Sequence, residues 1–164
     1  MAHKILSHPE IAHKIQRIAY QIYESNVAEK EIVVAGIVGT GMEFAKKLAS
    51  VLEEITTANI RLCEVSMDKK NPLKGVHCSI ALEDLKNKSL VLADDVLNSG
   101  STLIYGVHYF LQVPLKQIKT AVLVNRNHKK FPVKADFKGI SLSTSLQEHI
   151  EVRFESENDG VYLT

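Results

Sequence analysis

The stretch of residues 89–102 constrains the fold more than any other part of the chain. It begins with an apolar run short enough for a buried strand, passes Asp94 and Asp95, and continues into a small polar loop around Gly100. The segment that follows, residues 103–111, has the composition of a helix. This succession predicts a strand, a loop and a helix of an α/β fold, with polar groups gathered where the strand ends.

The loop in this stretch has the chemistry of an anion site. Backbone N–H groups of a loop and of the helix after it can converge on a phosphate, hydroxyls add donors, and a glycine lets the backbone come close. Asp94 and Asp95 carry the sign of phosphate, but they can accept hydrogen bonds from two ribose hydroxyls or help to hold Mg²⁺. A sugar diol beside its own 5′-phosphate suits both halves. The phosphate candidates are Asn98, Ser99, Gly100, Ser101 and Thr102.

Other apolar runs predict the remainder of a central, mainly parallel sheet. Residues 31–37 are apolar almost throughout, as in a parallel strand that is covered on both faces. Residues 57–65 and 120–124 are further strand candidates. Residues 151–154 and 161–163 read as short terminal strands with a turn between them. Helical segments alternate with the first strands, so we expect helices to flank the sheet.

Two helices are predicted in the first part of the chain. Ser7 and Glu10 form a capping box that begins the first helix, and Asn26 is expected to end it. Residues 42–52 form a second, amphipathic helix. The first helix has one apolar face, which consists of Ile11, Ile15, Ile18, Ala19 and Ile22.

The composition indicates one domain over residues 1–164. Hydrophobic residues make up 45% and charged residues 24%, which is typical of a globular protein. A formal net charge of +1 gives no general attraction to nucleic acid or to anionic membrane, so a polyanion site has to be local. Cys63 and Cys78 lack the spacing of a zinc or disulfide framework, and we expect free thiols. Neither a membrane span nor a signal-peptide pattern is evident, so we expect a cytoplasmic protein.

Two further loops are candidate parts of a site. The turn before the second helix is either a second anion loop or a tight turn that needs glycine for backbone reasons, and it consists of Val38, Gly39, Thr40 and Gly41. The polar run of residues 66–75 is either an ordinary exposed loop or a lid that closes over a ligand. In the second case its lysines would offset negative charge, and they are Lys69, Lys70 and Lys74.

Residues 91–102 resemble the phosphoribosyl pyrophosphate signature of the type I phosphoribosyltransferases, in which two acids follow a hydrophobic strand and a Thr/Ser-Gly-x-Thr loop follows them. The C-terminal half is similar to the bifunctional family of pyrimidine-operon attenuators and uracil phosphoribosyltransferases, over residues 123–139, 143–145 and 157–162. The resemblance covers nearly the whole chain, apart from a middle loop that is shortened here.

The resemblance implies a fold and a reaction. The fold is that of the type I phosphoribosyltransferases, with a central mainly parallel sheet and a small hood, and residues 131–140 would form a hood or edge segment. The reaction joins phosphoribosyl pyrophosphate to a nucleobase, with Mg²⁺ as cofactor. Uracil is the favoured base, as in pyrimidine salvage, and a purine is the alternative. The resemblance also implies a homodimer or a higher homo-oligomer.

Residue roles are likewise implied by the resemblance. Asp94 and Asp95 would orient the ribose and would hold Mg²⁺ only indirectly, through substrate or water. The loop of residues 98–102 would anchor the 5′-phosphate, the loop of residues 38–41 the pyrophosphate, and residues 66–75 would be the lid. Because the carboxyl ends of the strands in an open α/β sheet face the ligand crevice, the base pocket would be bordered by Val124, Asn125 and Arg126.

Three positions depart from the pattern of the family. Thr40 and Ser101 stand where the family usually has arginine, and Asn125 stands where it usually has aspartate. Charge-assisted hydrogen bonds are about twice as strong as neutral ones. We therefore expect weaker substrate binding or weaker transition-state stabilisation, and one alternative function is a nucleotide sensor with little catalytic activity.

A second alternative is an RNA-binding regulator of a pyrimidine operon. Relatives in the family bind a stem-loop of operon RNA through a basic face, and each neutralised phosphate adds salt-dependent affinity. Lysines also solubilise ordinary surfaces, and Tyr20 stands where the RNA-binding relatives tend to have histidine. The corresponding face of this chain would comprise Lys14, Arg17, Lys129, Lys130, Lys134 and Lys138.

Overall fold

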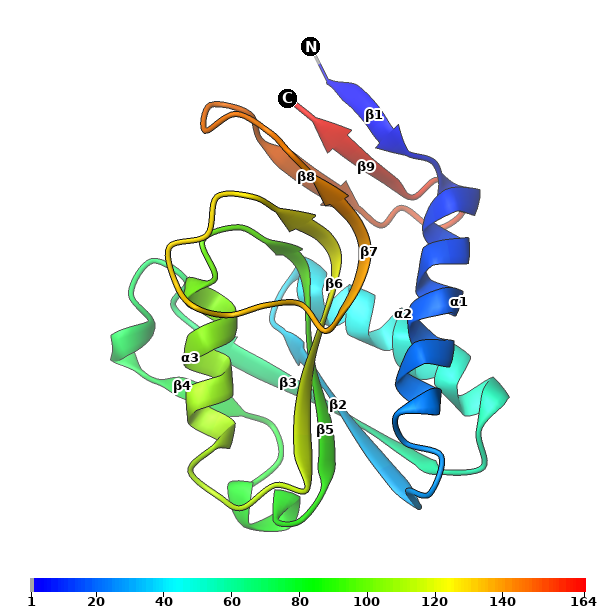
Figure 1. Cartoon of the computed structure of the whole chain (residues 1–164), viewed down its shortest axis with the longest axis vertical. Helices are drawn as coiled ribbons and strands as arrows, with labels where there is room; N and C mark the ends of the chain where they lie inside the picture. Colours follow the sequence, from blue (N-terminus) through cyan, green and yellow to red (C-terminus); the bar gives the residue numbers. More distant parts are fainter. Residues whose placement is uncertain (1) are drawn as a thin grey trace.

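The computed structural model describes residues 2–164, and its centre is a six-stranded sheet in the order β4-β3-β2-β5-β6-β7 (Figure 1). All neighbours in this sheet are parallel except β3 and β4, which are antiparallel. The expected mainly parallel sheet is therefore confirmed. Its strands are β2 Glu31–Ile37, β3 Asn59–Met67, β4 Val76–Cys78, β5 Ser89–Leu97, β6 Gln117–Arg126 and β7 Phe137–Leu142.

Three α-helices cover the two faces of the sheet. Helices α1 (His8–Glu24) and α2 (Thr40–Ile55) lie on one face and α3 (Ser101–Phe110) on the other (Figure 1). Alternate residues of the central strands enter the two cores: in β5, Val91 packs on the side of α1 and α2, whereas Leu92 packs on the side of α3. Burial on both faces explains why these strands are apolar almost throughout. Two short 3₁₀ helices, η1 Pro72–Lys74 and η2 Leu82–Leu85, complete the helical elements.

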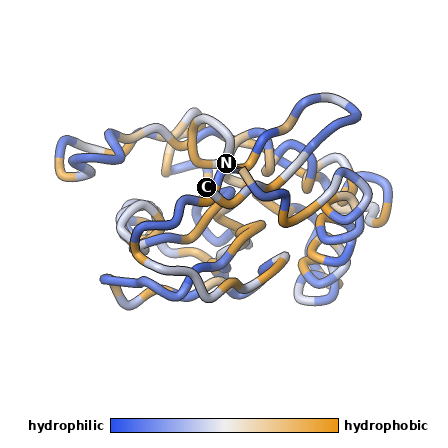
Figure 2. Tube along the Cα trace, turned by 90° about the horizontal axis from the view of Figure 1, so that it is seen from above, coloured by the Kyte–Doolittle hydropathy of each residue, from blue (hydrophilic) through white to orange (hydrophobic). Residues whose placement is uncertain are grey.

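A second, three-stranded antiparallel sheet joins the two ends of the chain. Its order is β1-β9-β8, with β1 His3–Leu6, β8 Ile150–Arg153 and β9 Gly160–Leu163. We call this sheet the hood, because it lies over the end of the molecule at which β5 and β6 finish (Figure 1). In Figure 2, which looks down on this end, the two termini lie next to each other. Within residues 2–164, none of the helices has the length and apolar character needed to cross a membrane.

The chain order of most elements was predicted, but some bounds differ. The capping box of Ser7 and Glu10 begins α1 as expected, and β2 has the expected bounds. The strand expected at residues 57–65 lies two residues later, as β3. Residues 131–140, expected as a hood or edge segment, end in β7, which is an edge strand of the main sheet and not part of the hood. Strands β1 and β4 were not predicted, because each is short and is defined by its partner strand rather than by its own pattern.

A buried polar cluster joins the end of α1 to the start of two strands. Asn26 follows the helix and is almost fully buried, and its Nδ2 donates to the carbonyl oxygen of Ile22 at 2.7 Å. Its Oδ1 accepts hydrogen bonds from Ser89 Oγ at 2.5 Å and from Gln117 Nε2 at 3.2 Å. The cluster satisfies buried polar groups at the amino ends of β5 and β6, opposite the hood.

A buried carboxylate fastens the hood to the helices. Asp159, in the turn before β9, is only 3% exposed. Its Oδ1 accepts a hydrogen bond from the backbone N–H of Glu155 at 2.8 Å, and its Oδ2 lies 3.4 Å from Lys47 Nζ on α2. The backbone N–H of Asp159 donates to His8 Nδ1 at the start of α1. One side chain thus ties the hood turn to both helices of that face.

We expect Asp159→Ala to lower the free energy of unfolding by about 1–3 kcal/mol, because it removes a buried carboxylate that accepts from the Glu155 N–H and pairs with the Lys47 ammonium. Urea unfolding followed by circular dichroism measures the change. Glu157→Ala, which removes an exposed acid from the same turn, is the matched control and should change stability by less than about 0.5 kcal/mol. Equal effects of the two variants would contradict the assigned role of Asp159.

Candidate functional site

A cavity of about 210 Å³ opens at the carboxyl end of β5. Most of its lining comes from β5, from the loop after it and from the first turn of α3, while the segment between β3 and β4 and the hood contribute one residue each. The lining residues are Lys69, Asp94, Asp95, Val96, Leu97, Asn98, Ser99, Gly100, Ser101, Thr102, Leu103 and Ile150. The structure therefore brings the two acids and the whole predicted phosphate loop into one hollow.

The two acids differ in exposure. Asp94 is 4% exposed, whereas Asp95 is partly exposed. The backbone N–H of Asp95 donates to Asp94 Oδ1 at 2.9 Å. Burial, and next the negative charge of Asp95, raise the pKa of the Asp94 carboxyl well above its usual range. A carboxylate pair of this kind favours an approaching cation or hydroxyl donors, and it repels phosphate.

The conformation of the loop after β5 depends on Gly100 and on hydrogen bonds from the segment after β6. Gly100 adopts a left-handed conformation (φ +89°), and a Cβ there would lie 2.6 Å from Val133 Cγ1. The carbonyl oxygen of Ser99 accepts hydrogen bonds from the backbone N–H groups of Lys130, at 2.8 Å, and Phe131, at 3.0 Å. This carbonyl points away from the α3 N-terminus, so the loop can present N–H groups and hydroxyls to an anion in the cavity.

The second predicted loop lies beside the acids. It joins β2 to α2, and Gly39 has a φ of +92° that favours glycine. Gly41 is buried against Asp94, since a Cβ on Gly41 would lie 2.5 Å from Asp94 Oδ1. A side chain at position 41 would therefore clash with Asp94, and glycine leaves room for the carboxylate. None of the residues 38–41 is among the described residues that line the cavity, so this loop borders the hollow rather than forming its wall.

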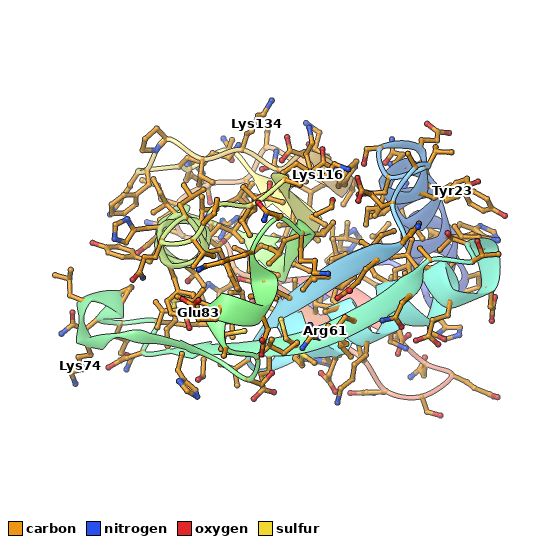
Figure 3. The ribbon with its side chains drawn as sticks, turned by 90° about the horizontal axis from the view of Figure 1, so that it is seen from below. Tyr23, Arg61, Lys74, Glu83, Lys116 and Lys134 are labelled. Atoms are coloured by element: carbon orange, nitrogen blue, oxygen red, sulfur yellow. The ribbon has the colours of Figure 1, made fainter. Side chains whose placement is uncertain are left out.

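The predicted lid, residues 66–75, begins in the last two residues of β3 and continues as the segment between β3 and β4. Lys69 lines the cavity, and its Nζ lies 4.0 Å from Asp94 Oδ1. Lys74 instead pairs with Asp68 at 3.4 Å and points outward (Figure 3), and Lys70 is exposed. The structure therefore brings one of the three lid lysines to the acids.

The residues predicted for the base pocket do not line this cavity. Val124 is 0% exposed and packs in the core under α1 and α2, so its side chain cannot reach a ligand. Asn125 donates from Nδ2 to Ser141 Oγ at 3.2 Å, and its buried Oδ1 has no hydrogen-bond partner in the described part of the chain. Arg126 is buried and is hydrogen-bonded to the loop after β5.

Ile150 is a lining residue that sequence reasoning missed. It is the first residue of β8 and reaches the cavity from the hood. Its apolar side chain predicts a strand position, but no local pattern indicates that the strand folds over β5. An apolar side chain in the lining suits the face of a ring better than it suits a phosphate.

The predicted basic face is only partly assembled. The guanidinium of Arg17 donates to the carbonyl oxygens of Lys138, at 3.0 Å, and Gly139, at 2.8 Å, and so joins α1 to β7. Lys14 lies beside Arg17 in a shallow surface hollow. Lys134 points to solvent (Figure 3), with its Nζ 3.8 Å from Asp136 Oδ1.

The last two members of that face, Lys129 and Lys130, follow β6 and lie behind the loop after β5. The structure therefore gathers Lys14, Arg17 and Lys138 on one surface around Arg17. Lys130 lies beside the loop after β5.

Comparison with known proteins decides the family. The family model for the phosphoribosyl transferase domain matches residues 1–157. The chain belongs to this family. A relative described as the bifunctional protein PyrR of Clostridium acetobutylicum is 32% identical over 170 residues, which cover 98% of this chain and 96% of the relative. The protein of the same description from Geobacter sulfurreducens is 33% identical over 162 residues, with coverage of 94% and 92%.

Solved structures confirm the fold class. A hypoxanthine-guanine phosphoribosyltransferase from Bacillus anthracis superposes with a TM-score of 0.71 at 21% identity, covering 85% of this chain and 81% of that one. A hypoxanthine phosphoribosyltransferase from Trypanosoma cruzi in complex with IMP superposes with a TM-score of 0.76 at 17% identity, covering 98% and 94%. At these identities the likeness concerns the fold alone. The type I phosphoribosyltransferase fold expected from residues 91–102 is thus confirmed.

The raised pKa of Asp94 predicts a pH-dependent stability. At a pH below the ordinary value of 3.8 the carboxyl is neutral in both states, and as the pH rises the unfolded chain loses this proton first, so the folded state is progressively destabilised. Asp94→Asn removes this destabilisation, because asparagine has no ionisable proton to lose. We expect the variant to melt about 2–4 °C above the wild type near pH 7, the shift that roughly 1 kcal/mol gives in a chain of this size.

The difference in melting temperature should shrink as the pH is lowered toward about 4, where wild-type Asp94 is neutral as well. Scanning calorimetry at several pH values measures it. The matched control is Asp84→Asn, which changes an exposed aspartate in η2. An Asp94→Asn variant that is less stable than the wild type at neutral pH would contradict the argument.

Proposed function

We propose that this protein transfers a phosphoribosyl group from phosphoribosyl pyrophosphate to a nucleobase, with uracil favoured, and releases pyrophosphate. The observation that supports this most directly is the single cavity in which Asp94, Asp95 and the loop of residues 98–102 meet. We also propose that the whole chain acts as one catalytic domain, in the cytoplasm, and assembles as a homodimer or a higher homo-oligomer.

The two ends of the ribose would be held by different groups. Backbone N–H groups and hydroxyls of residues 98–102, at the N-terminus of α3, would bind the 5′-phosphate, where the helix dipole favours negative charge. Asp95 and Asp94 would accept hydrogen bonds from the ribose hydroxyls. With both ends fixed, the anomeric carbon is oriented toward the incoming base, and orientation of this kind supplies a large part of the rate.

Mg²⁺ fits this arrangement as an indirectly held ion. Among residues 2–164 no three metal-ligating side chains cluster around one point. Mg²⁺ usually keeps several waters and is bound by one or two carboxylates together with substrate phosphates, which Asp94 and Asp95 could supply with the substrate. When bound, the ion supplies positive charge that offsets the charge of the leaving pyrophosphate.

The chain itself would contribute positioning and charge to the reaction. The bond between the anomeric carbon and the pyrophosphate oxygen breaks, positive charge develops on the ribose ring, and a nitrogen of the base forms the new bond. The proton of that nitrogen passes to water. The carboxylates beside the ring would stabilise that charge. The backbone of residues 38–41 and the Lys69 ammonium would meet the leaving pyrophosphate, and closure of the lid would exclude water.

The nature of the base rests on two kinds of similarity. The full-length relatives are described as the bifunctional protein PyrR, and the pattern of the C-terminal half is that of the pyrimidine family, which favours uracil. The superposed structures are of enzymes described as hypoxanthine or hypoxanthine-guanine phosphoribosyltransferases, so a purine is the competing substrate.

The deciding experiment is an assay of pyrophosphate release with Mg²⁺, phosphoribosyl pyrophosphate and each of uracil, hypoxanthine, guanine and adenine. We expect turnover with uracil. The double variant Asp94→Asn/Asp95→Asn should lose at least about 100-fold of the rate, because it removes the charges beside the reacting ring. The control is Glu83→Gln/Asp84→Asn, two exposed acids of η2.

Each outcome of the assay has a distinct meaning. Turnover with a purine alone would support the phosphoribosyltransferase activity and would show that the base is that purine and not uracil. Binding of UMP or IMP without turnover of any base would overturn the enzyme and leave the nucleotide sensor, for which Thr40 and Ser101 in place of arginine would be the reason.

RNA binding is a second candidate function, favoured by the surface that Lys14, Arg17 and Lys138 share along α1 and β7. Lys138→Glu should weaken binding of a pyrimidine-operon leader stem-loop and lower the slope of log affinity against log salt by about 1, because one phosphate contact is lost. Filter binding over a salt series measures it. Lys74→Glu, on the outward-facing tip of the lid, is the control, and binding that is absent or independent of salt would remove this candidate.

A further inference from the structure

Arg126 is a buried cation at the end of β6, and it is 8% exposed. All of its hydrogen bonds go to neutral acceptors. Its Nη1 donates to Asn98 Oδ1 at 3.0 Å, and its Nε and Nη2 donate to Thr144 Oγ1 at 3.0 and 2.8 Å. Nη2 also donates to the carbonyl oxygens of Ser145, at 3.2 Å, and Glu148, at 2.8 Å. A buried guanidinium with this many bonds is rigidly placed.

These bonds link two segments that are far apart in the sequence. Asn98 belongs to the loop after β5, whereas residues 143–149 form the connector between β7 and β8. Thr144 is held from the same side by the neighbours of Arg126, since its backbone N–H donates to Asn127 Oδ1 at 3.1 Å and its carbonyl oxygen contacts His128 Nε2. The end of β6 therefore clamps the connector beside the loop.

The bond to Asn98 determines which end of its amide faces the cavity. A guanidinium carries five donors and no acceptor, so the group of Asn98 that meets Arg126 has to be the carbonyl oxygen. The NH₂ group is then the free end of the side chain. Because Asn98 lines the cavity and its Oδ1 is bonded to Arg126, the part of its side chain left to meet a ligand is a donor.

The bonds to the connector determine where the hood reaches the cavity. The connector ends at residue 149, and the next residue is Ile150, which lines the cavity from β8. Asn98 is the member of the loop whose side chain is bonded to Arg126 at the end of β6. Ser99 contacts the segment after β6 only through its backbone carbonyl oxygen, and Ser101 and Thr102 belong to α3. Asn98 and Ile150 therefore border the side of the cavity that is turned toward the hood.

We propose that Arg126 is a positioning residue: it aims the NH₂ group of Asn98 at an acceptor atom of the nucleobase, and it holds the connector so that Ile150 forms the facing wall. The proposal rests on the proposed function, since it assigns the base side of that same site. The atom that meets Asn98 is a carbonyl oxygen or an unprotonated ring nitrogen. Arg126 acts without touching the ligand, in contrast to the expectation that it borders the base.

The test compares ligands with and without a base. UMP, IMP and ribose 5-phosphate are titrated by calorimetry into the wild type and into Asn98→Asp, which keeps the acceptor for Arg126 and replaces only the donor. The added charge weakens all three ligands through their phosphate, so the readout is the ratio of nucleotide affinity to ribose 5-phosphate affinity. We expect this ratio to fall at least about 10-fold, the change that about 1.4 kcal/mol produces, while the melting temperature is kept.

Arg126→Met should lower the same ratio at least about 10-fold, because the amide is then free to turn and the connector is released. Arg126→Lys, which keeps the charge and can make a single bond to Asn98, should restore part of it. Arg61→Met, the same change on β3 beside Glu31, is the matched control and should leave the ratio unchanged. The Asn98→Asp result carries the test on its own if Arg126→Met does not fold.

An equal loss of nucleotide and ribose 5-phosphate affinity in Asn98→Asp would place Asn98 at the phosphate and overturn the proposal, as would no loss at all. A ratio that is unchanged in a folded Arg126→Met variant would overturn the positioning role. If the wild type binds none of the three ligands, the proposed function is overturned together with this inference. If the wild type binds them and only the variant ratios fail to change, this inference alone is overturned.

Discussion

The position of β5 at the centre of a doubly covered sheet is the constraint on which the rest of the structure depends. It is hydrogen-bonded to β2 on one edge and to β6 on the other, and its faces enter both cores. A strand fixed on four sides cannot shift, so the acids at its end have a defined place. The parallel pairing also makes β2, β5 and β6 finish at one edge, where the loop after β2 meets Asp94 and the segment after β6 meets the loop after β5.

Charge in this region is unusually sparse for a family whose substrate is a polyphosphate. Thr40 and Ser101 are neutral, and the one lid lysine near the acids is Lys69. The guanidinium of Arg126, at the end of β6, is used inside the protein. Under the proposed function, anion binding would therefore depend chiefly on backbone N–H groups and helix N-termini, which are fixed in direction but individually weaker than an arginine.

Features that are determined by a few neighbouring residues could be predicted from the sequence. The capping box of Ser7, the bounds of β2 and the strand, acids and loop of residues 89–102 are each encoded within a few neighbouring residues. What failed depends on distant partners. The strand at residues 3–6 exists only because β9 pairs with it, and the placement of Ile150 and the bonds of Arg126 follow from packing between segments far apart in the sequence. Strand-end position alone placed Val124 near the ligand, whereas the alternation of the strand directs it into the core.

The pairing of the first strand with the last has a consequence for the order in which the protein is made. Among the described elements β1 is synthesised before all the others and its partner β9 after them, and β8 also needs β9 to become part of a sheet. Domains generally acquire structure from the N-terminus while the chain grows. The sheet around β5 can therefore assemble during synthesis, while the wall that carries Ile150 closes only after β9 has left the ribosome.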